Sequence, residues 1–394
     1  MKMKMNMLLS GIAIAFSSSV LAVEPEAYIT DSGIVITPII NAGYKYDNNI
    51  FSQEDDTKES GIFMFSPTTN FLLNDGVNSY QVDIGAQWGM FIDSSDDNSF
   101  AGDLGFKTHL EPSSRSRFDI ELEANKKVET RGTGITEGLG DFVDEPLSYN
   151  EQLAQLTYEY GSLSSSARIA FMGSYYNKNY TNFDAITQFR NFNKSTVGST
   201  FYYSTNSNTD AFLELKGGST KYDLSENVSR DSDDFTAYVG VEWEATALTS
   251  GSFKIGQEEK DFSDAGREDF KGVSWEGNIN WQPLTYTTLS LTTSRSTKNP
   301  DVQGDYIKES IYGANWTHEW NEKVTSTLNY SYRHEDYSGF ERVDKNNNYY
   351  ADVIYQFKRW ADISLYMEYT DKDSTNENIV YDKTIIGLDF TFSL

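Results

Sequence analysis

The chain has 394 residues, no Cys, and a net charge of −27 from 59 acidic and 32 basic residues. The lack of Cys excludes disulfides, thiol catalysis, Cys-based metal sites and a lipoprotein anchor. The acidic balance, with no basic patch, argues against nucleic acid as a partner. A mean hydropathy of −0.55 excludes a bundle of spanning helices, yet Tyr, Phe and Trp are abundant. A membrane β-barrel reconciles these two facts, because half of each strand faces water.

The N-terminus predicts a secretory signal peptide over residues 1–22. Lys2 and Lys4 form its charged region, and an apolar run then ends at a small-residue cleavage site. That run is too short and too rich in Ser for a spanning helix. Removing the segment takes away two Lys and no acid, so the exported chain is even more acidic. We expect residues 23–32 to form a short periplasmic lead and residues 33–394 to form the barrel.

The first two predicted strands, 33–46 and 61–73, each contain a Pro, namely Pro38 and Pro67. Pro removes a donor from the hydrogen-bond ladder and is disfavoured inside a closed sheet. The two Pro residues therefore suggest strand starts or β-bulges.

The same region carries a motif. Thr37-Pro38 is followed by Gly43-Tyr44-Lys45-Tyr46-Asp47-Asn48-Asn49-Ile50-Phe51 and then by Ser66-Pro67. This run resembles the opening of the putative beta-barrel porin type 2 family. The resemblance implies an outer-membrane barrel and, since many members belong to clusters for exopolysaccharide, biofilm or capsule secretion, a glycan cargo. It also implies periplasmic polysaccharide export proteins and an inner-membrane polymerase system as partners.

Period-two patterns continue through the rest of the chain, with short turns alternating with long polar loops. The further predicted strands are 80–93, one ending at Leu110, one through Phe118 to Asn125, 151–160, 166–176, 194–204, 209–222, 233–246, 251–261, 269–282, 286–297, 306–320, 323–334, 348–358, 361–371 and 379–394. The total of about 18 strands is even, which leaves both termini on the periplasmic side. Two of these strands, 194–204 and 251–261, have the weakest patterns, the second because it is thin in apolar residues, so 16 strands is the alternative.

The last strand alternates strictly to the end of the chain. Its apolar face consists of Ile386, Leu388, Phe390, Phe392 and Leu394, and small or polar residues lie between them. Bacterial outer-membrane barrels end in such a strand, whose terminal aromatic residue is read by the barrel assembly machinery. They usually end in Phe, whereas this chain ends in Leu. We predict an assembly signal at Leu388, Phe390, Phe392 and Leu394; the alternative is an amphipathic strand of a soluble sandwich.

Aromatic residues collect near the strand ends, including Trp281, Trp316, Trp320 and Trp360 beside short turns. Two girdles at the membrane interfaces would produce this distribution, with outer-membrane lipids and lipopolysaccharide as partners. The acidic loop runs lack a calcium-loop pattern and are expected to be solvated, or bridged to lipopolysaccharide through cations.

No pattern of catalytic residues emerges. The three His residues, His109, His318 and His334, have no plausible Ser partner, and no Gly-x-Ser-x-Gly occurs. With 59 acids, carboxylate pairs arise by chance and carry no signal. We therefore predict a protein that is not an enzyme, with no catalytic residue, cofactor or metal site.

The face opposite the apolar one predicts a hydrated, mainly acidic lumen, too wide at this strand number to be filled by side chains. The predicted pore-lining residues are Asp83, Gln87, Asp119, Glu121, Glu123, Arg168, Glu214, Lys216, Tyr238, Glu242, Glu244, Glu276, Tyr366 and Glu368.

The residues alone leave the cargo open. Amides and Tyr suit a sliding sugar chain, whereas a merely wettable lining suits a diffusion porin. Because of the family resemblance, our leading hypothesis is an outer-membrane channel that secretes an exopolysaccharide. The alternatives are a general or solute-selective porin and a structural or adhesive barrel acting through its acidic loops.

Overall fold

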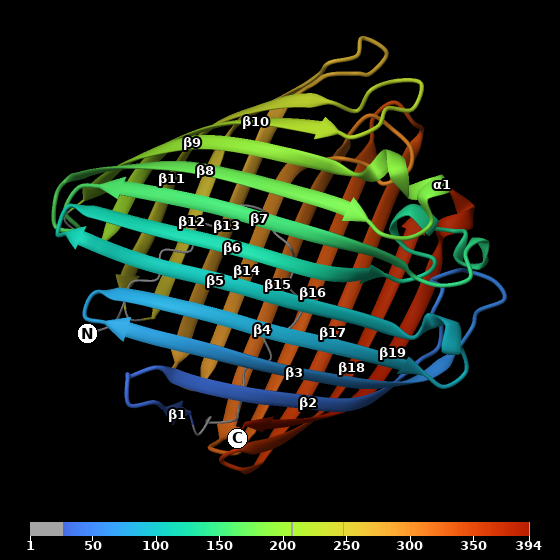
Figure 1. The fold of residues 1–394 in the computed structure, drawn as a ribbon, viewed down its shortest axis with the longest axis horizontal. Coiled ribbons are helices and arrows are strands. Elements are labelled where there is room, and N and C mark those ends of the chain that lie inside the picture. The colour runs from blue at the N-terminus through green and yellow to red at the C-terminus, as the bar shows by residue number, and fades with distance from the viewer. Residues whose placement is uncertain (1–26, 206–207, 247, 394) are drawn as a thin grey trace.

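The computed structural model describes residues 27–205, 208–246 and 248–393. The predicted signal peptide, residues 1–22, and Leu394 of the predicted assembly signal lie outside the described residues. Within them, eighteen antiparallel strands, β2 to β19, form one closed barrel (Figure 1). Closure is made by β19 and β2, which pair from Ile385↔Asp47 to Ser393↔Ile39.

The strands of the barrel and its small helical elements have the following bounds. The strands are β1 Tyr28–Ile29, β2 Val35–Asp47, β3 Ser60–Asp75, β4 Asn78–Phe91, β5 Ser99–Ser113, β6 Ser116–Glu129, β7 Leu147–Tyr160, β8 Ala167–Tyr180, β9 Phe192–Thr205, β10 Thr209–Tyr222, β11 Ser232–Thr246, β12 Thr249–Phe262, β13 Phe270–Leu284, β14 Thr287–Lys298, β15 Ile307–Asn321, β16 Val324–Tyr337, β17 Arg342–Lys358, β18 Ala361–Ser374 and β19 Tyr381–Ser393. The α-helix is α1 Asp184–Thr187, and the 3-10 helices are η1 Ser95–Asp97, η2 Gly134–Thr136, η3 Gly140–Phe142, η4 Gln188–Arg190 and η5 Glu377–Ile379.

Each strand has an apolar outer face and a polar inner face. In β6, Leu122 is exposed on the outside, while Glu121 and Glu123 alternate with it on the lumen side. A lipid environment offers no partner for backbone N–H and C=O groups, so every strand must pair on both sides. The closed barrel satisfies this requirement, and the predicted fold class is confirmed.

The strand number is 18 rather than the alternative of 16. Both strands with the weakest sequence patterns exist, as β9 and β12. β9 pairs with β10 without interruption from Thr209↔Thr205 to Tyr222↔Phe192. A continuous backbone ladder therefore maintains a strand whose side chains give a weak signal.

The expectation that Pro38 and Pro67 mark strand starts or bulges is wrong. Both lie inside their strands, and they pair in register with Thr69 and Ile40. Between β3 and β4 the ladder skips Pro67, then resumes in the same register. The missing donor is thus accommodated by omitting a rung, which leaves the strands in step.

The two ends of the barrel differ. Short turns join the strands at one end, where β2 begins and β19 ends, and long loops with α1 lie at the other (Figure 1). The predicted lead is partly ordered, because β1 pairs with the start of β2 through Tyr28↔Ile36. Among the described residues, no helix is both long and apolar enough to cross a membrane.

Aromatic side chains surround the outside of the short-turn end. Trp281, Trp320 and Trp360 are exposed there. His318 stacks on Trp316 with ring centroids 5.4 Å apart and contacts Trp320 at 4.4 Å. Amphipathic rings of this kind prefer the membrane interface, which gives the turn end an aromatic girdle.

Candidate functional site: the lumen and its outer mouth

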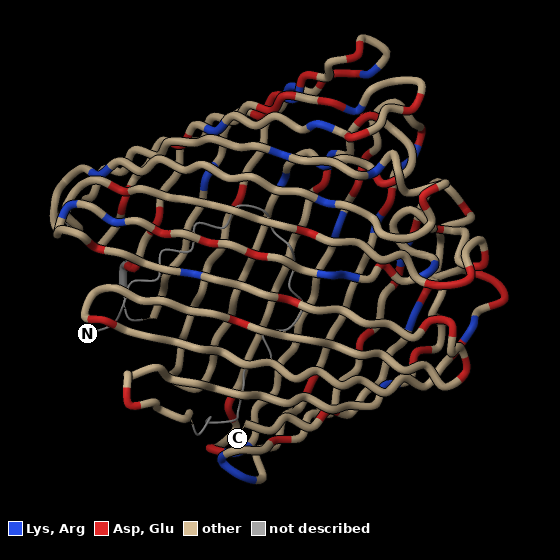
Figure 2. The backbone as a smooth tube through the Cα atoms, in the orientation of Figure 1, with Lys and Arg blue, Asp and Glu red and all other residues tan. Residues whose placement is uncertain are grey.

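The predicted pore-lining residues lie on the inner face of the barrel wall, opposite the exposed apolar side chains. They do not form one uniform lining. Figure 2 shows Lys and Arg interleaved with Asp and Glu along the strands, with acidic residues gathered in the long loops. The lumen divides into one wall in which acids and bases are paired and another in which acids face neutral partners.

Arg168 of β8 is the centre of the first paired cluster. Its guanidinium contacts Asp210 at 2.5 Å and Glu159 at 3.4 Å, and it lies 5.0 Å from the ring centre of Tyr202. Arg117 pairs with the same Glu159 at 2.5 Å. Glu159 and both Arg side chains are buried, so this cluster holds β6 to β10 together rather than offering free charge.

Glu214 of β10 is the centre of the second paired cluster. Its carboxylate, 2% exposed, accepts hydrogen bonds from Lys216 at 3.1 Å and Lys254 at 3.2 Å. Lys254 also pairs with Glu276 at 3.1 Å and lies 5.0 Å from the ring centre of Tyr238. Four predicted lining residues thus come together around one Lys that sequence reasoning missed.

Other predicted acids are also partnered. Glu121 and Glu123 share Lys107, at 2.5 and 3.8 Å. Asp119 contacts His109 at 2.6 Å. Glu242 lies 3.8 Å from the Arg168 guanidinium.

Two other predicted acids, Asp83 and Glu244, make no direct ion pair among the described residues. Asp83 accepts from the amides of Asn70 and Gln81, both at 2.7 Å. Gln87 pairs in register with Ala101, and the backbone N–H of Glu244 donates to a turn carbonyl.

The missed basic residues carried a usable signal. Lys107, Arg117 and Lys254 all have inward parity, because they lie two residues from Gly105, Asp119 and Ser252. The predicted set of pore-lining residues included the acids but omitted these three bases, which made the lumen look more acidic than it is. The structure corrects it for β5 to β12, where most charges are paired.

Midway along β17 and β18, two acids accept hydrogen bonds from neutral donors, whereas Asp344 near the loop end of β17 is paired with Arg342 and Lys372. Glu368 accepts from Asn348 Nδ2 at 2.7 Å, and Asp352 accepts from the Thr327 N–H at 2.9 Å. Tyr366 lies between them on the same face. Free negative charge in the lumen is therefore concentrated where the barrel closes.

The β6–β7 loop, residues 130–146, folds inward across one half of the outer mouth. Arg131 anchors its start by two hydrogen bonds to Asp97, at 2.7 and 2.6 Å. These bonds raise the pKa of the Arg131 guanidinium above its ordinary value. The tip reaches the far wall, where Glu137 pairs with Arg342 at 2.5 Å and with Lys372. The loop thus connects β6 to β17 and β18.

The β14–β15 loop, residues 299–306, is held at the same end of the barrel by Arg side chains from three other loops. Arg230 donates to the carbonyls of Pro300 at 3.2 Å and Val302 at 2.7 Å. Arg190, from the β8–β9 loop, donates to Val302 at 3.2 Å, and Arg267 donates to a third carbonyl of the loop. Burial and the neighbouring Arg190 lower the pKa of Arg230 to about 10. The β8–β9, β10–β11 and β12–β13 loops therefore all bind the β14–β15 loop.

The sequence motif at the end of β2 stabilises both the seam between β2 and β19 and the β6–β7 loop. Asn49 Nδ2 donates to the Asp382 carbonyl at 2.9 Å, and Asn48 Oδ1 accepts from the Thr384 N–H at 2.7 Å. Both bonds tie β2 to β19 at the barrel seam. Phe51, 3% exposed, packs under the Arg131 guanidinium at 4.3 Å and so supports the β6–β7 loop.

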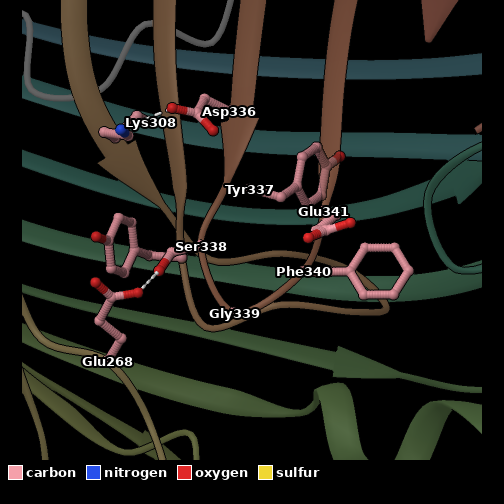
Figure 3. Close-up of a pocket in the computed structure, with 9 residues that line it drawn as sticks. Glu268, Lys308, Asp336, Tyr337, Ser338, Gly339, Phe340 and Glu341 are labelled. Atoms are coloured by element: carbon pink, nitrogen blue, oxygen red, sulfur yellow. Dashed lines mark hydrogen bonds and ion pairs between the residues drawn. The ribbon is translucent and has the colours of Figure 1, made fainter. Parts of the chain in front are cut away.

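A cavity of about 610 Å³ lies at the outer rim beneath the β16–β17 hairpin (Figure 3). Three of its charged groups already have partners, since Lys308 pairs with Asp336 at 2.7 Å and Ser338 donates to Glu268 at 2.6 Å. We therefore look to the lumen, rather than to this rim cavity, for the function.

The closed barrel, its aromatic girdle and its polar lumen define an outer-membrane β-barrel of the porin type, located in the outer membrane of a Gram-negative bacterium. The chain belongs to the family described as Putative beta-barrel porin 2, whose model matches residues 33–394. This confirms the family that the motif at Gly43–Phe51 suggested.

Three solved structures with a similar fold are distant from this chain in sequence. OpdK of Pseudomonas aeruginosa with vanillate is 11% identical, covers 91% of this chain and 99% of its own, and has a TM-score of 0.49. OprD of Pseudomonas aeruginosa is 12% identical, with coverages of 95% and 97% and a TM-score of 0.46. The siderophore receptor PirA of Acinetobacter baumannii is 7% identical, with coverages of 91% and 80% and a TM-score of 0.47. No curated protein matches the chain. We infer nothing about substrates from likenesses this weak.

Proposed function

We propose that the protein is a passive diffusion channel, not an enzyme, that admits small hydrophilic solutes through the outer membrane and favours cations over anions. The observation that carries the proposal is the inward folding of two loops over the mouth. Glu137 fixes the β6–β7 loop to the far wall, and Arg230 fixes the β14–β15 loop from the other side. A mouth narrowed by fixed loops suits single solutes.

The lumen supports the same proposal. A barrel of 16–18 strands leaves an aqueous channel between its walls. The acids facing neutral partners on β17 to β19 give that channel an excess of negative charge, which attracts cations. The exopolysaccharide export implied by the family resemblance has no support in the fold or in the family match, so the porin alternative is the better one.

The experiment is reconstitution in planar bilayers and in liposomes loaded for solute-swelling assays. The purified protein should conduct ions and admit small neutral sugars with a sharp upper size limit. Glu137→Gln removes the charge that holds the loop tip, so conductance and the size limit should both rise. Glu54→Gln changes an exposed loop acid and is the matched control. A protein that conducts no ions in either form would overturn the proposal.

Gene deletion separates this function from polysaccharide export. Loss of the channel should slow uptake of small solutes and leave surface polysaccharide intact. Normal uptake with polysaccharide lost from the surface would instead establish the export hypothesis.

A further inference from the structure

Two stacked Tyr rings face the lumen midway along the wall where the barrel closes. Tyr350 of β17 and Tyr366 of β18 have ring centroids 6.0 Å apart and planes inclined by 28°. Their strand neighbours Tyr349 and Leu365 are exposed on the outer face, which places the pair inside. Tyr350 donates its hydroxyl to Asp352 at 3.1 Å. The pair thus presents an aromatic surface beside a carboxylate.

Gly387 on β19 and Gly43 on β2 leave room for this cluster to lie flat against the barrel wall. A Cβ on Gly387 would come within 2.3 Å of the Tyr366 ring, and a Cβ on Gly43 within 1.8 Å of Asp389 Oδ1. Any side chain at either position would displace Tyr366 or Asp389. The Gly43 of the family motif and the Gly of the last strand therefore shape one site.

The polar atoms around the rings are almost all acceptors. Asp352, Glu368 and Asp389 contribute carboxylates, and Lys45 is the described basic residue that interacts with both Glu368 and Asp389. Three carboxylates against one ammonium group leave a net negative charge. The paired clusters of the opposite wall have no such surplus.

Amide oxygens add to this demand for donors. Asn348, 6% exposed, turns its Nδ2 to Glu368 at 2.7 Å, because a carboxylate can only accept. Its Oδ1 is then left without a donor among the described residues, as is Oδ1 of Asn329, which pairs in register with Tyr350. Buried acceptors of this kind are costly unless a partner supplies the proton.

We propose that Tyr350, Tyr366, Asn348, Asp352, Glu368 and Asp389 form a binding site inside the channel for a small organic ammonium ion with further hydroxyl groups, such as an amino sugar. The ammonium group pairs with the carboxylates and lies near the aromatic faces, which attract cations. The hydroxyl groups donate to the amide oxygens once the Asn side chains turn toward the lumen, because both oxygens are covered in this structure. The inference rests on the proposed function and names its preferred solute.

The test is a ligand-observed NMR titration of detergent-solubilised protein with D-glucosamine, N-acetyl-D-glucosamine and MgCl2. Glucosamine should bind the native protein more tightly than its neutral N-acetyl form. Asp389→Asn and Tyr366→Leu should each weaken glucosamine about tenfold, the equivalent of one charge-assisted contact or one cation–π contact. Lys45→Gln should tighten it, because Lys45 competes for the same carboxylates.

Two matched variants guard against trivial causes. Asp83→Asn removes a lumen acid on β4, outside the proposed site, and should leave glucosamine affinity unchanged. Tyr366→Phe keeps the ring and should bind as the native protein does. Retention of heat-modifiable migration on gels establishes that each variant is folded.

Three results would overturn the inference: equal weakening in Asp83→Asn and Asp389→Asn, equal affinity for the neutral sugar, or Mg²⁺ binding at lower concentration than glucosamine. Because binding is measured without a membrane, the outcome is separable from conduction. A protein that binds glucosamine but does not conduct refutes only the proposed function. One that conducts without discriminating the two sugars refutes only the site.

Discussion

Two walls of the same lumen use charge in opposite ways. Along β8 to β12, the buried acid Glu214 is held by two bases, Lys216 and Lys254. Along β17 to β19, Glu368 and Asp352 accept from neutral donors instead. Ion pairs stabilise the first wall and cancel most of its electrostatic field, whereas the acids of the second wall leave a negative field that acts on solutes. Charge that stabilises the barrel and charge that acts on cargo are thus spatially separated.

The largest effect is expected from a variant that tests which residues face lipid and which face the lumen. The description of both walls depends on this assignment. Phe390 of β19 is exposed on the lipid side, next to Asp389 on the lumen side. Phe390→Arg should cost up to about 2–4 kcal/mol if it lies near mid-membrane, and it also damages the predicted assembly signal. The amount of protein in isolated outer membranes should collapse.

The control for this variant must respect the structure. Thr391 is on the lumen side as expected, but it is only 7% exposed and pairs with Asp362. An Asp there would oppose another acid directly, so Thr391→Asn is the milder choice. Similar losses for Phe390→Arg and Thr391→Asn would contradict the assignment of the two faces.

A smaller effect should separate the walls by stability. Glu214→Gln leaves two lysines without their buried acid, and breaking a buried pair in this way costs about 3–5 kcal/mol. Asp389→Asn removes an acid that interacts with one base, Lys45, without a direct ion pair, and it should cost less. We expect the temperature at which the folded gel band disappears to fall clearly for the first variant only. Equal shifts would mean that the two walls do not differ.

The smallest expected effect concerns the mouth. Burial alone would raise the pKa of Glu226, but the hydrogen bond from Arg190 and the charges of Arg190, Arg230 and Arg267 together outweigh it, so the pKa lies below its ordinary value. The pairing therefore holds the loops at neutral pH and is lost only as the pH falls through that lowered pKa. Single-channel conductance should rise slightly in acid. Glu226→Gln should lack that component, and an unchanged acid response in the variant would contradict this role.

The strands were predictable because period-two alternation is local. Even β12, thin in apolar residues, was placed within two residues of its observed ends, 251–261 against Thr249–Phe262. Each strand carries its own pattern of faces, so parity also put Glu121 and Glu214 on the inner side. The sequence pattern was therefore sufficient for the barrel.

The contacts between distant segments were not predictable in this way. Glu137 and Arg342 are 205 residues apart, and nothing in either neighbourhood marks them as partners. Pairing within the lumen depends on which strands are adjacent and in which register, as for Arg168 and Asp210. The sheet accommodates the missing N–H donor of Pro67 by a gap in the β3–β4 pairing and not by a bulge. This outcome depends on the neighbouring strands and could not be read from the local sequence.

The reversal potential of the channel in a KCl gradient tests the central claim most directly. The native protein should prefer K⁺ over Cl⁻, most strongly at low salt, where screening is weak. The pair of changes Glu368→Gln and Asp389→Asn should reduce that preference severalfold, while the charge-neutral pair Lys107→Gln and Glu121→Gln should leave it unchanged. A native channel that prefers Cl⁻, or a preference that falls equally in both double variants, would contradict the account.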